Sequence, residues 1–168
     1  KWYKILLREY YKRQYIPDIF LFSGLASSSY SKAKNKIGAH TMDYDIYLNI
    51  KNKPTNNTDS YAVFLDEDMI YHPEHHQLNY EPAATEAKYY PTLIQFLKKF
   101  EIENSLKVKF ALSPKSNSKN LPNLLKDIDY SIGNTAELVK NSKAVLLHCS
   151  TAMSYAILFK KPIIFLTT

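Results

Sequence analysis

The sequence predicts an α/β fold in which a parallel β-sheet carries helices on both faces. From residue 61 onward, short apolar runs of strand length alternate with segments whose apolar residues have helical spacing. The runs 61–65 and 144–148 are almost entirely apolar, which is typical of parallel strands buried on both faces. The 168 residues fit about one domain of ordinary size, and 45% of them are hydrophobic, enough to form a core.

The first fifty residues have a less regular pattern. Pro17 ends a run with helical spacing, and Gly24 closes a short apolar run. The elements expected here are a helix over 2–15, a buried strand over 18–23, a loop over 25–36 and a strand-like segment around 45–48.

Residues 51–60 are polar throughout and contain Pro54, which predicts a linker. We therefore expect residues 1–56 to be the tail of a preceding domain with this linker, and residues 57–168 to be a second domain. The chain begins at Lys1 and ends directly after the apolar run 162–166, a pattern that indicates a fragment cut at both ends.

In the second expected domain, several residues mark where helices and strands begin and end. Pro91 suits the first turn of a helix whose apolar stripe includes Leu93 and Leu97. Asn134 and Glu137 have the spacing of a capping box. The expected strands are 61–65, 108–112, 130–132, 144–148 and 162–166, and the expected helices are 91–104, 134–141 and 150–159, with a short helical or irregular stretch over 121–127.

Composition excludes several kinds of protein. Cys149 is the only cysteine, so neither an internal disulfide nor a multi-cysteine metal site is expected. The three glycines are too few for a P-loop or a G-x-G-x-x-G dinucleotide motif. No apolar stretch is long enough to span a membrane and no secretory signal is visible, which predicts a cytoplasmic protein.

The net charge of +6 is densest over residues 1–13, where lysines and arginines alternate with aromatic residues. This segment fits a solvated helix face, a peripheral contact with the inner face of the cytoplasmic membrane, or a contact with sequence outside this chain. Nucleic acid is not an expected partner, because no recognised nucleic-acid-binding motif is present.

Unusual polar residues follow the predicted strands at their carboxyl ends, where open parallel sheets bind ligands. Because these ends share one edge of the sheet, we expect one site there. The candidate residues are Asp66, Glu67 and His72 after the first strand, Lys115 after the second, Asn134 and Thr135 after the third, and His148, Ser150, Thr151 and Ser154 after the fourth.

Each candidate has a functional and a structural interpretation. Asp66, Glu67 or Asp68 can serve as a general base, or only hydrogen-bond the loop, and His72 is a further candidate on the catalytic side. The hydroxyls that open the helix at Ser150 can cap it, or cap it and also contact a phosphate. Asn134 and Thr135 can cap a helix, or also contact a phosphate or a ribose. Lys115 can be a solvated surface lysine or a phosphate contact. His148 can be a satisfied strand-end residue or a ligand contact. The histidines of 72–76 do not have the spacing of a metal site, so no metal is expected.

Residues 133–168 resemble the end of the donor-binding domain of GT-B glycosyltransferases, in particular those of bacterial surface-polysaccharide (capsule and O-antigen) biosynthesis. The resemblance lies in a T-x-E-L helix at Thr135, a Ser-Thr pair at 150–151 and a Lys-Pro pair at 161–162, with a looser likeness over 61–73. Where related sialyl- and polysialyl-type transferases carry a His-Pro pair after the second strand, this chain has Ser113-Pro114-Lys115, which argues against a CMP-sialic acid donor.

The resemblance implies a Rossmann-like domain over 57–168 that binds a nucleotide sugar. The implied reaction is sugar transfer to a growing surface polysaccharide or a lipid-linked acceptor, with no metal and no tightly bound cofactor. Asp66, Glu67 and His72 would line the cleft on the catalytic side, and the other candidates would contact the donor. Two alternatives remain open: a nucleotide-sugar 2-epimerase of the same architecture, and a non-catalytic domain that binds a partner or a membrane.

Overall fold

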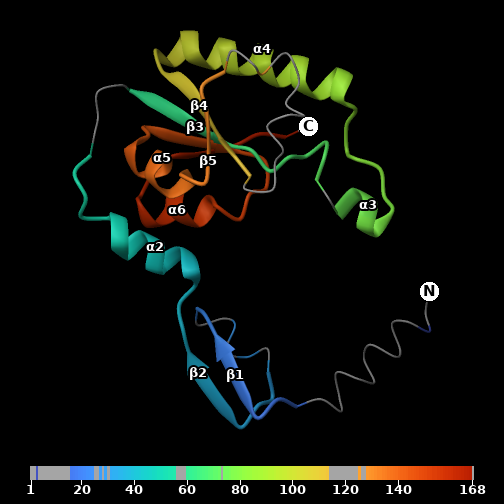
Figure 1. Cartoon of the computed structure of the whole chain (residues 1–168), viewed down its shortest axis with the longest axis vertical. Helices are drawn as coiled ribbons and strands as arrows, with labels where there is room; N and C mark the ends of the chain where they lie inside the picture. Colours follow the sequence, from blue (N-terminus) through green and yellow to red (C-terminus); the bar gives the residue numbers. More distant parts are fainter. Residues whose placement is uncertain are drawn as a thin grey trace. The chain divides into compact units, whose positions relative to one another are not determined.

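The computed structural model of the chain (Figure 1) has two compact units, residues 1–45 and 46–168. The division falls inside helix α2 (Met42–Ile50), upstream of the polar stretch 51–60. The expected helix over 2–15 and the stretch 121–127 lie outside the described residues, apart from Tyr3 and Leu125. The structure describes residues 3, 16–24, 27, 29, 31–55, 60–72, 74–113, 125 and 128–167.

The first unit contains a two-stranded parallel sheet formed by β1 (Ile19–Phe22) and β2 (Asn35–Gly38). A strand at β1 is confirmed, but the prediction that it is buried is wrong, since Leu21 is 64% exposed. The expected loop is also wrong at its end, because β2 begins inside it. Two strands alone cannot bury both faces of a sheet, which explains the exposed apolar side chains.

The expected strand around residues 45–48 is wrong, because this segment lies in helix α2. Helical spacing brings Tyr47 and Ile50 to the same side. The ring of Tyr47 packs against that of Phe159, with 5.0 Å between the ring centroids, and Ile50 is buried in the core of the second unit. A short apolar run fits either kind of element by itself, and here the packing partners select the helix.

The second unit has a five-stranded sheet with the order β5-β4-β3-β6-β7, and every neighbouring pair is parallel. This architecture confirms the predicted α/β fold, and all five expected strands are present. The chain reverses its direction of travel across the sheet between β3 and β6, so a switch point lies there. The strands are β3 (Tyr61–Leu65), β4 (Lys107–Leu112), β5 (Tyr130–Ile132), β6 (Ala144–Leu147) and β7 (Ile163–Phe165).

Helices cover both faces of this sheet, as Figure 1 shows. Helix α4 (Glu86–Asn104) packs on the face that includes Phe64, while α5 (Thr135–Asn141) and α6 (Met153–Leu158) pack on the face that includes Val63. Alternate residues of β3 therefore enter two separate cores. All five residues of β3 are buried, so the central strand gives a rigid base to the loop that follows it.

Two helices begin several residues away from the expected positions. Helix α4 begins at Glu86, so Pro91 lies inside the helix and not in its first turn, and the buried Tyr89 and Tyr90 lengthen its apolar face. Helix α6 begins at Met153, after a turn, and not at Ser150. A further short helix, α3 (Glu74–Leu78), was not expected. None of the helices in the described part of the chain combines the length and apolar content that crossing a membrane requires.

The expected capping box of α5 does not form. Asn134 occupies the N-cap position, but its side chain makes no capping hydrogen bond. Glu137 instead forms an ion pair with Lys53 at 3.1 Å. Lys140, one turn later, donates hydrogen bonds to the backbone carbonyls of Ile50 and Lys53. The polar side chains of α5 thus hold the end of α2 and the turn after it.

Candidate functional site

A cavity of about 670 Å³ lies at the carboxyl ends of β3, β4 and β6, next to the switch point of the sheet. The loop after β3, the loop after β6 and the first residue of α5 contribute to its wall, and the segment around α3 forms another side. Open α/β sheets bind their ligands at this position. Its polar lining residues are Asp66, Glu67, His72, Glu74, His75, Tyr80, Ser113, Thr135, Cys149, Ser150 and Thr151.

Asp66 directly follows the central strand and lines this cavity. Its backbone N–H donates to the carbonyl of Ala111 at 3.0 Å, which fixes the residue between β3 and β4. Burial raises the pKa of its carboxyl to about 7, and the negative charges of Asp68 and Glu67 add to this rise. A carboxyl with this pKa can accept or release a proton near neutral pH, as a general base must.

Glu67 links two loops that are far apart in the sequence. Its Oε1 accepts a hydrogen bond of 2.9 Å from the backbone N–H of Cys149. The linkage is possible because β3 and β6 are neighbours in register, with Leu65 opposite Leu147. The carboxylate of Glu67 is therefore held against the loop after β6.

The loop after β6 presents hydroxyl groups to the cavity. Ser150 and Thr151 both line it, and Thr151 is exposed. The hydroxyl of Ser150 accepts the N–H of Ala152 at 3.3 Å, and the N–H of Ser154 donates to the carbonyl of Thr151. Since α6 starts only at Met153, the expected helix start at Ser150 is a turn, and a ligand here would meet side-chain hydroxyls and loop backbone.

The segment around α3 lines the cavity with imidazoles, an acid and a phenol. The Nε2–H of His75 donates to the carbonyl of Met69 at 2.7 Å, which assigns the proton of the neutral ring to Nε2. The Nδ1 of His75 is buried and has no partner among the described residues. Nδ1 of His72 accepts the backbone N–H of Glu74 at 3.3 Å.

Among the described residues, the ionisable side chains with a possible full charge that line the cavity are mostly acidic. Asp66, Glu67 and Glu74 line it, whereas no described lysine or arginine does. Over the same residues, no group of three or more His, Cys, Asp or Glu side chains is arranged to hold a metal ion. The wall therefore suits neutral hydroxyl groups better than a free anion, except where the loop after β6 supplies N–H donors.

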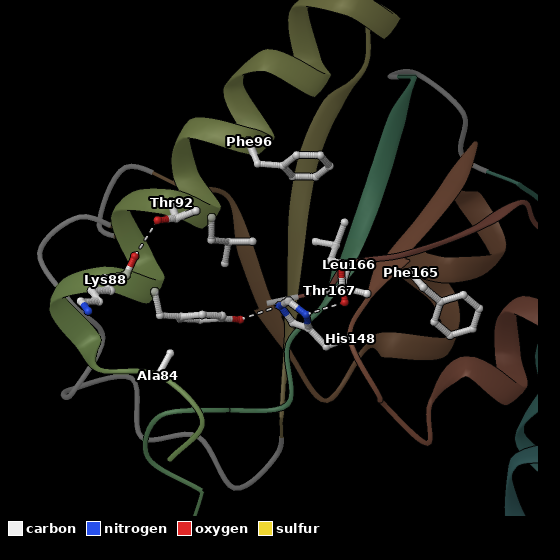
Figure 2. A pocket seen from close by; sticks show the side chains of 10 residues that line it. Ala84, Lys88, Thr92, Phe96, His148, Phe165, Leu166 and Thr167 are labelled. Atoms are coloured by element: carbon white, nitrogen blue, oxygen red, sulfur yellow. Dashed lines mark hydrogen bonds between the residues drawn. The ribbon is translucent and has the colours of Figure 1, made fainter. Parts of the chain in front are cut away.

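His148 lies at a different cavity, of about 500 Å³, between α4 and strands β6 and β7. Figure 2 shows its ring between Thr92 and Phe165. Because Nδ1–H of His148 donates to the carbonyl of Leu166 at 2.9 Å, Nε2 is the acceptor for the hydroxyl of Tyr89 at 3.1 Å. Burial and the negative charges of Asp66 and Glu67 raise the pKa of Tyr89, so this hydroxyl stays protonated. Both nitrogens of His148 are thus used within the protein, which favours its interpretation as a satisfied strand-end residue.

The structure brings six of the ten predicted site residues together and places three elsewhere. Asp66, Glu67, His72, Thr135, Ser150 and Thr151 line the first cavity. Asn134 is exposed and does not line it, Ser154 lies within α6, and His148 belongs to the second cavity, while Lys115 lies outside the described residues.

Sequence reasoning missed the side of the cavity that Glu74, His75 and Tyr80 contribute. The signal was present in the run 72–76, of which only His72 was named as a candidate for this site. Comparison of the chain with protein-family models and with curated proteins finds no significant match.

Proposed function

We propose that this protein transfers a sugar from a nucleotide-activated donor to a hydroxyl group of an acceptor. The observation that carries the proposal is the half-buried Asp66 carboxyl, with a pKa of about 7, in a large cavity at the switch point of a parallel sheet. This position suits a nucleotide ligand, and this acid suits the removal of a proton from a hydroxyl.

In the proposed reaction Asp66 is the general base. Its carboxylate accepts the proton of the acceptor hydroxyl while the hydroxyl oxygen attacks the anomeric carbon of the donor sugar. The bond between this carbon and the phosphate oxygen breaks, and the nucleotide leaves with the electron pair. The acidic wall of Asp66 and Glu74 supports binding of uncharged hydroxyl groups on this side of the cavity.

The donor nucleotide is proposed to bind at the loop after β6. Ser150 and Thr151 offer hydroxyls to a phosphate, and Thr135 at the start of α5 offers one to a phosphate or a ribose. The acceptor is proposed to be a growing surface polysaccharide or a lipid-linked glycan, from the resemblance of residues 133–168. The reaction is proposed to need no bound metal.

Nucleotide binding to the whole chain tests this proposal. We expect CMP, UDP, GDP or dTDP to raise the melting temperature at millimolar concentration, equally with and without Mg²⁺. In the Ser150→Ala/Thr151→Ala variant we expect affinity to fall by about tenfold or more, because each lost hydrogen bond to a charged phosphate is worth about 1.5–3 kcal/mol.

Thr92→Ala is the matched control, since it removes a hydroxyl that lines the second cavity. We expect it to leave nucleotide affinity unchanged. A folded double variant that binds as tightly as the wild type would refute the donor site. No binding of any nucleotide would favour the non-catalytic alternative. An epimerised nucleotide sugar formed without an acceptor would favour the 2-epimerase.

A further inference from the structure

The contact between Glu67 and Cys149 lies inside the proposed donor site. Glu67 lines the same cavity as Ser150 and Thr151, and its carboxylate accepts the backbone N–H of the residue directly before them. A backbone N–H in a loop that binds phosphate is a group that the phosphate itself would use. In this structure the carboxylate of Glu67 already accepts the hydrogen bond of that N–H.

A carboxylate and a phosphate cannot share this N–H favourably. Both are negatively charged acceptors, and they would repel each other across a cavity wall that also contains Asp66 and Glu74. No described lysine or arginine lines the cavity to offset this repulsion. For a phosphate to reach Cys149, the side chain of Glu67 must therefore leave its place.

We propose that Glu67 is an intrachain competitor of the donor phosphate: its carboxylate occupies the backbone N–H of Cys149 until a nucleotide displaces it. The inference rests on the proposed function, because it assigns a regulatory role at the same site. It also separates the roles of the two adjacent acids. Asp66 is the base, and Glu67 controls access of the donor.

Two substitutions at this position distinguish competition from simple support of the loop. Glu67→Gln keeps an oxygen that can accept the N–H of Cys149 but removes the charge, and Glu67→Ala removes both. Competition predicts that both variants bind UDP, GDP, dTDP or CMP more tightly than the wild type, by about tenfold, which corresponds to about 1.4 kcal/mol. Support of the loop predicts that Glu67→Ala binds more weakly and that Glu67→Gln rescues the binding.

The measurement is isothermal titration calorimetry of the whole chain with each nucleotide, with circular dichroism of each variant to confirm the fold. Glu74→Gln is the matched control, because it removes an acid from the same cavity that has no hydrogen bond to Cys149. We expect it to change the affinity less than Glu67→Gln does.

Tighter binding in both Glu67 variants supports the inference. Unchanged or weaker binding in them, with a wild type that binds, overturns the inference and leaves the proposed function intact. Failure of the wild type and of all variants to bind any nucleotide overturns both.

Discussion

The pH dependence of stability gives the most direct test of the environment assigned to Asp66. Burial raises the pKa of its carboxyl from 3.8 to about 7 in the folded chain. The folded protein therefore binds more protons than the unfolded chain between these two pH values, and stability must fall as pH rises through this interval. Asn at this position cannot ionise, so Asp66→Asn removes this contribution.

The magnitude follows from the two pKa values. A rise from 3.8 to about 7 spans about three pH units, and each unit corresponds to 1.36 kcal/mol, so ionised Asp66 costs the folded state up to about 4 kcal/mol. This is an upper value, because the side chain is partly exposed and water screens its charge. For a chain of this length the cost corresponds to a difference of up to about 8–16 °C in melting temperature.

Urea unfolding of the wild type and Asp66→Asn at pH 5 and pH 8.5 measures the part of this effect above pH 5, which is about two pH units or up to about 2.7 kcal/mol. As pH rises, we expect the free energy of unfolding of the wild type to fall relative to that of the variant. Only the wild type must ionise a carboxyl at this half-buried position. All other ionisable side chains are the same in both proteins, so the comparison isolates the contribution of Asp66. Glu74→Gln is the control, because Glu74 is exposed. A difference between Asp66→Asn and wild type that does not change with pH would refute the assignment.

Two further predictions concern the fold. Phe64→Ala should lower the free energy of unfolding by about 3–5 kcal/mol, because Phe64 is fully buried beside Phe110. Phe96→Ala should lower it much less, since Phe96 is 39% exposed. Urea denaturation of both variants measures the difference. Asn134→Ala should change thermal stability by less than the ~1 kcal/mol typical of a lost helix cap, because Asn134 makes no capping hydrogen bond. A larger loss would mean that its side chain does cap α5 in solution.

The strands of the main sheet could be predicted because their signal is local. Continuous apolar runs such as β3 and β6 have few ways to bury every side chain, and the centre of a parallel sheet is one of them. The carboxyl edge follows from the same topology, so Asp66 and the pair at 150–151 could be named from the sequence and are found at one cavity. The predicted helix boundaries were less accurate because proline and serine favour a helix start without fixing it. Helix α4, for example, begins before Pro91, at Glu86.

Other features depend on contacts between residues that are far apart in the chain. The local residue pattern predicted a strand where α2 forms and a capping box at Asn134. It also gave a ligand contact as one of two interpretations of His148. The packing of Tyr47 on Phe159 and the ion pair of Glu137 with Lys53 replaced the first two interpretations. The hydrogen bonds of His148 to Tyr89 and Leu166 favour its structural interpretation. A polar or half-buried side chain takes the best partner that the fold presents to it, and its sequence neighbours do not reveal that partner.

The raised pKa of Asp66 and the bond from Cys149 to Glu67 belong to this second group. Amino-acid type and spacing determined the class of fold, the central strands and the edge where polar residues gather, because burial of apolar runs depends mainly on the run itself. The tertiary structure alone decided which acid is buried, which is held by a distant loop and which histidine is already satisfied, because desolvation and hydrogen bonding depend on atoms brought together by folding.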